Sequence, residues 1–313
     1  MRLYKHYSKN IYISGSNATM LSSELKSALR GWPEEEETLP LSFREYCEFK
    51  GVDANGWLES DLAKIRNAFF DYNNGGGFPE VVLTDNPLQK AKILQGYFDT
   101  MLLKDLVEHY NLSNIEVLRY YLKRIMANLT KPTSIRAIHG DIKSRGLKVS
   151  KDNLYDWAGY ACDIFMFLRI PNYSKSLQKV ESSQPKYYCI DNGLRDAVLL
   201  PQANDDGKKL ENTVFLQLYR QRTPVDKIYY YQGKGECDFV IQRGTEIAQL
   251  IQVTWDMTDE ETRKREIIGL IEASNATNCD NLLIITADQH DEIITDDGKK
   301  IHVIPAWRWL LGK

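Results

Sequence analysis

Apolar residues recur every three or four positions between residues 39 and 129, and this period predicts a region of packed helices. One apolar stripe comprises Leu58, Leu62, Ile65 and Phe69. A second comprises Leu94, Phe98, Met101, Leu102 and Leu106. The run 73–77, Asn-Asn-Gly-Gly-Gly, is expected to be a flexible helix breaker, and Asn86–Pro87 is expected to begin the next helix.

The N-terminal segment has a different pattern. Residues 10–13 form a short apolar run typical of a strand, residues 14–17 a polar turn, and residues 21–29 a helix. One strand and one helix cannot make a sheet. Either this strand pairs with a later part of the chain, or the chain begins inside a domain whose first part is missing.

Residues 131–200 predict a winged helix. A helix over 134–143, a turn at 144–147 and a second helix from Ser150 to about Ala161 form a helix-turn-helix pattern. Strand-like runs at 164–168 and 187–190 flank a polar stretch and would form a two-stranded wing.

The pattern from residue 210 onward predicts a compact α/β domain. Helices are expected at 210–219 and 259–274, and strands at 227–231, 237–241, 248–253, 281–286 and 301–304, followed by a short helix that contains tryptophan. The apolar runs 250–251 and 282–285 are typical of strands buried on both faces.

The composition narrows the class of protein. The 313 residues, 43% hydrophobic and 27% charged, suit a globular protein of more than one domain. No run approaches the roughly 18 apolar residues of a membrane helix, and the start lacks a signal peptide's apolar run, so we expect a cytoplasmic protein without a membrane partner. Five dispersed cysteines without a CxxC motif predict reduced, mostly buried thiols and no metal site.

The net charge of -3 means that any surface for a polyanion must come from local clustering. Residues 131–151 supply such a cluster, with six basic residues against Asp141 alone. In a winged helix, Lys143 and Arg145 would reach phosphates, whereas the start of the second helix would face the major groove. The candidate DNA-binding residues are Lys143, Arg145, Lys148, Lys151, Asn153 and Tyr155. The alternative is a solvated face on a winged helix that packs against a protein partner.

A second candidate site combines Glu211, Asp238 and Gln252. Two strands joined by a tight turn would bring Asp238 and Gln252 side by side, with Glu211 across from them. This arrangement resembles the PD-(D/E)xK nuclease core, in which acids hold a divalent metal and a lysine stabilises the developing charge. Here Gln252 replaces the third acid and Thr254 the lysine. An active nuclease, a retained scaffold without cleavage and an ordinary α/β core all remain open.

Other catalytic motifs are missing from the sequence. It contains no GxxxxGK[ST], no GxSxG and no HExxH, and its five histidines are scattered singly. We therefore expect neither a hydrolase triad nor zinc-dependent hydrolysis.

Several segments together resemble prokaryotic AAA+-type P-loop ATPases that carry a C-terminal domain of unknown function. The segments are 13–17, 41–46, 77–81, 186–188, 191–194, 210–212 and 238–240. The resemblance implies a Walker A and Walker B core, a sensor turn, a helical lid, a winged helix and a nuclease-like domain, with ATP and magnesium as cofactors of full-length relatives. Those relatives often have glutamine at the position of Gln252, which favours a domain that does not cleave.

Measured against that plan, the chain starts just after Walker B. The resemblance makes Ser14, Ser16 and Asn17 the ATP sensor region if the core is completed, and it implies no cofactor in this chain by itself. Members of that family commonly have an arginine after the glycine at the position of Gly31, where this chain has Trp32, and Arg30 is a candidate substitute.

The predicted organisation is a mixed α/β and α multidomain protein. It comprises an ATPase-core remnant at 1–40, a helical lid at 41–130, a winged helix at 131–205 and a restriction-endonuclease-like domain at 206–313. The leading hypothesis is a truncated family member that binds double-stranded DNA or a protein partner without its own ATPase activity. The alternative is a metal-dependent nuclease acting on DNA, so whether the chain is an enzyme stays open.

Overall fold

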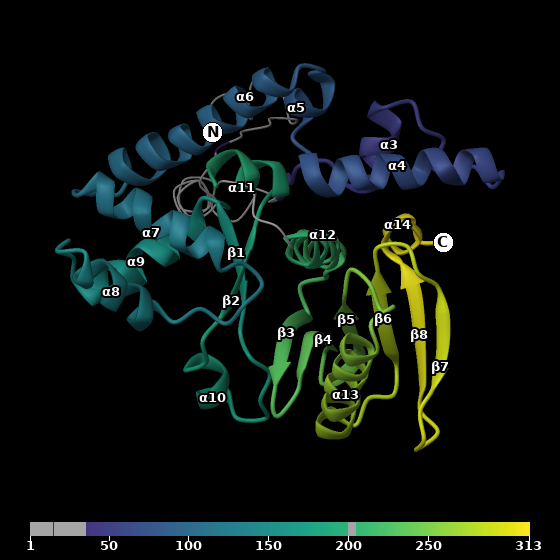
Figure 1. Ribbon diagram of the computed structural model, residues 1–313. Helices are drawn as coiled ribbons and strands as arrows, with labels where there is room; N and C mark the ends of the chain where they lie inside the picture. Colours follow the sequence, from purple (N-terminus) through teal and green to yellow (C-terminus); the bar gives the residue numbers. More distant parts are fainter. Residues whose placement is uncertain (1–14, 16–35, 200–204) are drawn as a thin grey trace, which may run out of the picture.

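The computed structural model describes residues 15, 36–199 and 205–313. These residues form a mixed α/β structure, in which a predominantly helical part precedes a six-stranded sheet (Figure 1). The strand expected at 10–13, the helix expected at 21–29 and the sensor residues Ser14, Ser16 and Asn17 lie outside the described residues.

The first part is helical, as the apolar period predicts. It comprises α3 (Phe43–Phe49), α4 (Glu59–Gly75), α5 (Pro79–Leu83), α6 (Pro87–Thr100), the π-helix η1 (Met101–Glu108) and α7 (Ile115–Ala127). Both expected stripes face the core at Ile65, Phe69, Leu94, Phe98, Leu102 and Leu106. The prediction for Leu58 is wrong, because this residue is the N-cap of α4 and its side chain is 70% exposed.

The glycine run at the end of α4 ends the helix and packs tightly against other segments. Gly76 has a φ of +79°, which favours glycine, and a Cβ there would lie 2.1 Å from Oδ1 of Asp191. The expectation of a flexible segment therefore needs correction: Asn73 is fully buried as part of α4, and Gly77 donates a backbone hydrogen bond to Asp191.

Two helices and a two-stranded sheet follow. Ser134 caps α8 (Ile135–Ser144) and Ser150 caps α9 (Lys151–Asp163), so both helices begin where the sequence predicts. The strands β1 (Phe167–Ile170) and β2 (Lys186–Cys189) pair antiparallel, and Pro132 forms a bridge to Lys186 on β2. The first strand begins three residues later than expected, since Phe165 adopts a φ of +58° and ends α9 in a turn. The helices α10 (Leu177–Glu181) and α11 (Asn192–Val198) precede and follow β2.

The C-terminal part is the six-stranded sheet with three helices. Its elements are α12 (Asp206–Gln221), β3 (Asp226–Gln232), β4 (Glu236–Arg243), β5 (Glu246–Val253), α13 (Glu260–Thr277), β6 (Leu282–Thr286), β7 (Asp291–Ile294), β8 (Lys300–Pro305) and α14 (Ala306–Leu311). The strand order is β3-β4-β5-β6-β8-β7. The first three strands are antiparallel, and β6 pairs in parallel with both β5 and β8. The burial of β6 along its whole length was predicted, whereas β7, a short and mostly exposed strand, was not.

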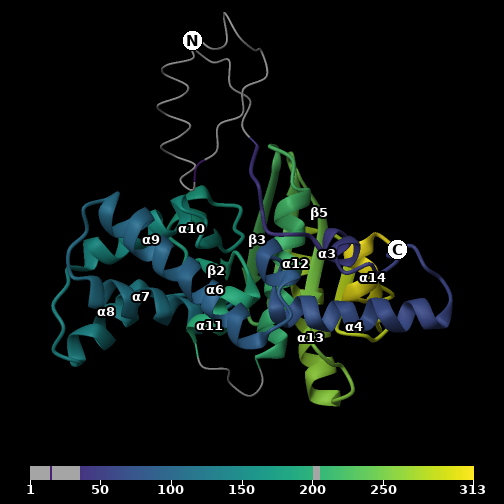
Figure 2. The same cartoon turned by 90° about the horizontal axis from the view of Figure 1, so that it is seen from above.

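Helix α12 lies between the two sheets, where it contacts β2 on one side and β5 on the other (Figures 1 and 2). The sheets also meet through the backbone, because Tyr173 N–H donates to the Tyr230 carbonyl over 2.6 Å. The two-stranded sheet is therefore fixed against the edge strand β3.

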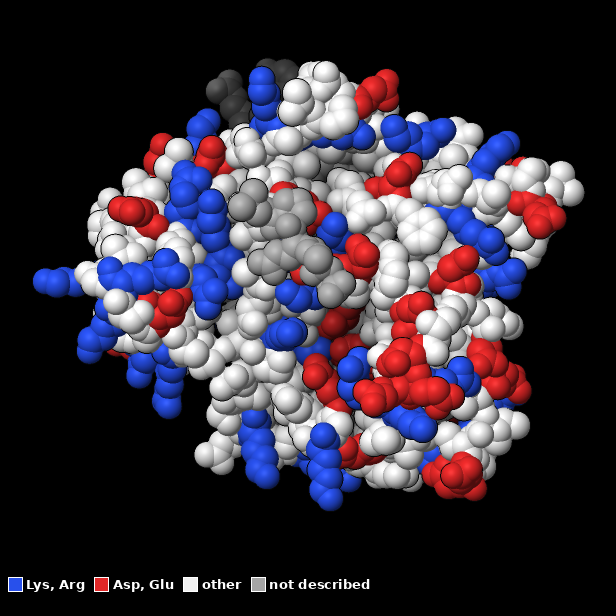
Figure 3. All heavy atoms as spheres, viewed as in Figure 1, with Lys and Arg blue, Asp and Glu red and all other residues white. Residues whose placement is uncertain are grey.

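The cysteines, the apolar character of the helices and the distribution of surface charge complete the description of the fold. All five cysteines are free thiols, four of them buried, as expected. No helix among the described residues is both long and apolar enough to span a bilayer. In Figure 3, basic side chains gather over the region of α7 to α9, and acidic side chains over the region of the C-terminal sheet and α13.

Candidate functional site

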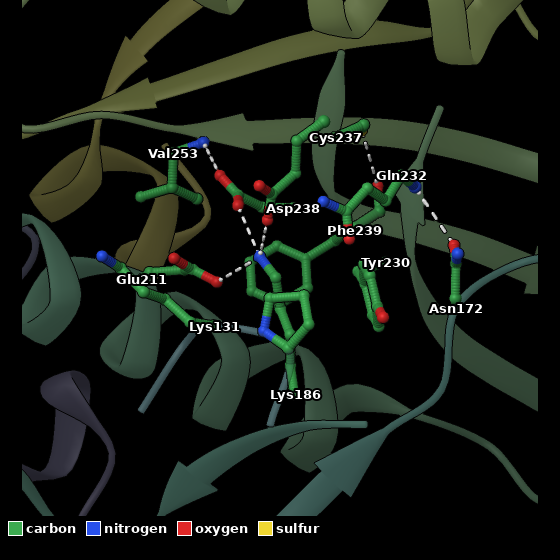
Figure 4. A network of polar contacts seen from close by, with 12 residues as sticks. Lys131, Asn172, Lys186, Glu211, Tyr230, Gln232, Cys237, Asp238, Phe239 and Val253 are labelled. Atoms are coloured by element: carbon green, nitrogen blue, oxygen red, sulfur yellow. Dashed lines mark hydrogen bonds and ion pairs between the residues drawn. The ribbon is translucent and has the colours of Figure 1, made fainter. Parts of the chain in front are cut away.

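A buried lysine lies at the centre of the polar network in Figure 4. The side chain of Lys186 is 1% exposed, and its Nζ lies 2.9 Å from Oδ1 of Asp238, 3.1 Å from Oε1 of Glu211 and 2.7 Å from Oε1 of Glu236. Sequence reasoning predicted the convergence of Glu211 and Asp238 but missed both Lys186 and Glu236.

The local structure explains how Lys186 reaches this position. It is the first residue of β2, and residues two apart on a strand point to the same face, so Tyr188 follows it into the network. The Tyr188 hydroxyl donates to Oε1 of Glu211 over 2.8 Å. The ring of Tyr230 lies 5.5 Å from the ammonium and adds a cation–π contact.

Asp238 and Gln252 lie side by side on β4 and β5, as predicted. The Asp238 N–H donates to Oε1 of Gln252 over 3.1 Å, and the Val253 N–H donates to Oδ2 of Asp238 over 2.9 Å. The Gln252 amide in turn donates to Oε2 of Glu266 over 2.5 Å. Glu266, on α13, is a buried acid that sequence reasoning missed. The position corresponding to the nuclease lysine, Thr254, is buried, and its hydroxyl donates to the Asp256 carbonyl.

The electrostatics of the site follow from burial. Burial and the neighbouring Asp238 carboxylate raise the pKa of Glu211 to about 8, and Lys186 offsets part of this effect. Burial would lower the pKa of Lys186, but the carboxylates of Asp238 and Glu211 hold it well above its ordinary value. Burial also raises the pKa of Glu266. Three carboxylates around one ammonium thus favour uptake of a proton by Glu211.

The donor set does not have the form of a metal site. Across 36–199 and 205–313, no three His, Cys, Asp or Glu side chains are placed to hold a metal ion. The ammonium of Lys186 stands among the carboxylates that would otherwise be available. One signal in the sequence pointed to this lysine: it begins an otherwise apolar and aromatic strand, Lys-Tyr-Tyr-Cys.

A second buried network surrounds Asp191. Its carboxylate accepts from the Gly77 N–H over 2.6 Å and from the Leu194 N–H over 2.9 Å. Burial raises the pKa of Asp191 to about 6, although these backbone donors favour the charged form. Gly193 lies so close to α4 that a Cβ there would stand 2.2 Å from the Gly75 carbonyl oxygen.

Three consecutive residues of α12 connect the two networks. Glu211 binds Lys186, Asn212 binds Asn192, and Thr213 donates to Oδ1 of Asn73 on α4. The segments 77–81, 186–188, 191–194, 210–212 and 238–240 therefore meet around this helix, although they are far apart in the sequence.

The candidate DNA-binding residues lie apart from these networks, on α8, the following turn and α9. All six are exposed. An open groove of about 560 Å³ runs beside the turn, and its lining comprises Ser113, Asn114, His139, Lys143, Leu147, Lys148, Val149, Ser150, Asn153 and Trp157. Lys143, Lys148 and Asn153 therefore share one site.

The other three candidates do not line the groove. Arg145 lies 4.7 Å from the centre of the Tyr120 ring and pairs with Asp141 at 3.5 Å. Lys151 and Tyr155 lie on α9, whose exposed face also carries Asp152 and Asp156. Positive charge is thus concentrated at the turn, and the body of α9 is acidic.

Comparisons with known proteins place the chain among uncharacterised relatives. A family model described as a domain of unknown function (DUF8612) matches residues 66–205. An uncharacterised protein of Haemophilus influenzae is 27% identical over 305 residues, which cover 97% of this chain and 72% of that protein. No solved structure matches. The uncharacterised protein MJ1544 of Methanocaldococcus jannaschii is 33% identical over 314 residues, which cover 96% of this chain and 69% of that protein. The chain therefore belongs to the same protein family as MJ1544.

Proposed function

We propose that this protein binds duplex DNA through the region of α7 to β2, and that its C-terminal part is a nuclease-like scaffold that does not cleave. The observation that carries the proposal is the groove beside the α8–α9 turn, with Lys143 and Lys148 in its lining and Lys151 next to it. Exposed ammonium groups at such a turn suit the phosphates of a duplex.

The order of elements supports a winged helix. α7, the short pairing segment at Pro132, α8, α9 and the antiparallel strands β1 and β2 follow one another in the order of that motif. In this arrangement α9 is the recognition helix. Its N-terminal residues and the turn before it would then meet the DNA.

The charges on α9 favour contact with the DNA backbone over reading of the bases. Asp152 and Asp156 are exposed on the same helix as Lys151 and would repel phosphates if the helix lay deep in a groove. We therefore expect binding that depends little on DNA sequence, because backbone contacts carry no direct sequence information.

The order α12-β3-β4-β5-α13-β6, with its acids on α12 and β4, supports a restriction-endonuclease-like scaffold. The proximity of Glu211 and Asp238 favours a second candidate function, metal-dependent DNA cleavage with Gln252 as the third ligand. We rank it lower because the Gln252 side chain is engaged by Asp238 N–H and by Glu266, and because Thr254 supplies no ammonium.

The resemblance to P-loop ATPases raises the question of ATP hydrolysis. The sequence has no GxxxxGK[ST] motif, so we infer no ATP hydrolysis by these 313 residues alone. A protein partner at the same basic surface is a third candidate.

The test compares duplex binding by wild type with that of Lys148→Glu/Lys151→Glu, using fluorescence anisotropy with magnesium present. The matched control is Lys227→Glu/Lys264→Glu, which reverses two exposed lysines on β3 and α13. We expect the first variant to lose binding and the control to keep it, with intact DNA on a gel afterwards. Equal binding by both variants would refute the proposed surface, and cleavage that Asp238→Ala abolishes would establish the nuclease instead.

A further inference from the structure

We propose that Lys186 is the resident cation of the carboxylate site: its ammonium occupies the place that a divalent metal ion would need. The proposal rests on the non-cleaving part of the proposed function and deepens it. In this proposal the counter-ion of the carboxylates is a side chain of the protein itself, on strand β2 of the two-stranded sheet.

The donors of the Lys186 ammonium match the acceptors around it in number. A lysine ammonium has three N–H donors and no acceptor. Three carboxylate oxygens, from Glu211, Glu236 and Asp238, lie between 2.7 and 3.1 Å from Nζ. Each donor therefore has one carboxyl oxygen within reach, and the ammonium has no free position for a ligand of its own.

Two of the three acids and the lysine are buried. Glu211 is 8% exposed and Asp238 is 5% exposed, so each would be strongly destabilising without a positive partner. Lys186 itself is almost completely buried, with 1% of its surface exposed. The charged carboxylates thus require a cation nearby, and the side chain of Lys186 supplies it.

The Lys186 ammonium excludes a divalent ion from the same position. A divalent ion takes carboxylate oxygens at about 2.0–2.6 Å, so an ion shared by Glu211 and Asp238 would stand in contact with the ammonium. Repulsion between the two cations at such a distance in a buried site is strong. Lys186 and a divalent ion are therefore mutually exclusive occupants.

The three acids differ in their exposure to solvent, and this difference allows a test. The side chain of Glu236 is 40% exposed, so the site borders on solvent at one end. Without the lysine side chain, Glu211, Glu236 and Asp238 could move together around a metal ion that enters from that end.

The experiment is titration of Mn²⁺ followed by electron paramagnetic resonance of the free ion. Wild type, Lys186→Ala and the exposed-lysine control Lys227→Ala are compared. We expect Lys186→Ala to bind one Mn²⁺ at least about tenfold more tightly than the other two proteins, because the repelling ammonium is gone. Adding Asp238→Asn to Lys186→Ala should abolish this binding.

Circular dichroism checks the folding of each variant, and Lys186→Met, which keeps the packing of the stem, is measured beside Lys186→Ala. The wild-type titration decides the proposal even if both variants unfold: tight Mn²⁺ binding that Asp238→Asn removes would overturn it. Folded variants without any gain in Mn²⁺ affinity would overturn it too. DNA binding is measured on the same samples, so a failure of the DNA proposal is seen separately.

Discussion

Nζ of Lys186 lies 2.9 Å from Oδ1 of Asp238, although the two residues are 52 positions apart and belong to different sheets. This ion pair joins the two-stranded sheet to the six-stranded one at the centre of the molecule. It also makes β2 part of the candidate site, because Tyr188 on the same face of the strand hydrogen-bonds Glu211.

Replacing Lys186 should destabilise the fold strongly. Lys186→Met leaves buried carboxylates without a cation, and breaking a buried ion pair from one side costs about 3–5 kcal/mol. Urea unfolding measures this loss, with Lys227→Met as an exposed control expected to change stability by less than about 0.5 kcal/mol. Adding Glu211→Gln and Asp238→Asn to Lys186→Met should restore part of the stability. A Lys186→Met protein as stable as wild type would contradict the burial argument.

Asp191 should make stability depend on pH. Its folded-state pKa of about 6 lies above the value of 3.8 of an ordinary aspartate, so between these two pH values the native state holds a proton that the unfolded chain has released. The contribution is fully present below about pH 3.8 and is lost as the pH rises through 6, with a total near 3 kcal/mol. Unfolding free energies of wild type and Asp191→Asn between pH 4 and 7.5 test this. As the pH rises, the unfolding free energy of wild type should fall relative to that of the variant. Parallel curves would rule the effect out.

The glycine run at the end of α4 offers a matched pair of substitutions. Gly76→Ala places a Cβ at positive φ and 2.1 Å from the Asp191 carboxylate, so we expect a loss of about 3 kcal/mol. Gly75→Ala meets no atom within 4 Å and lies in the helix, so it should be neutral or stabilising by about 0.5–1 kcal/mol. Thermal unfolding of the two variants gives the comparison. A tolerated Gly76→Ala would show that the contact with Asp191 is dispensable.

The acidic residues on α9 should weaken DNA binding. Asp152→Asn/Asp156→Asn removes two negative charges from the exposed face of the helix and should raise duplex affinity about three- to tenfold. Because we expect backbone contacts, the gain should be equal on duplexes of unrelated sequence. Competition titrations with several duplexes measure it. A gain confined to one sequence would instead assign base reading to α9.

The parts of the fold that could be predicted from the sequence are those set by local pattern. The helices α8 and α9 begin at the residues expected from the sequence, and the tight turn expected between β4 and β5 pairs these strands, which brings Asp238 beside Gln252. The prediction that Leu58 is buried was wrong because the helical spacing of apolar residues includes this position, whereas Leu58 is the N-cap of α4. Its backbone is extended there, so its side chain does not lie on the buried face of the helix.

The rest depends on contacts between distant segments. Nothing near Lys186 in the sequence shows that β2 faces α12 and β4, and Glu266 lies on a helix whose position is set by the sheet beneath it. The contact of Gly77 with Asp191 spans 114 positions. Such pairs follow from how the sheets and helices pack, which periodicity along one segment does not encode.

The salt dependence of duplex binding tests the central claim most directly. If the side chains of Lys143, Arg145, Lys148 and Lys151 neutralise four phosphates, the logarithm of the association constant should fall against the logarithm of salt with a slope of about -3.6. Lys148→Glu/Lys151→Glu should bind weakly with a much shallower slope. A flat dependence, or no binding by wild type at low salt, would contradict the account.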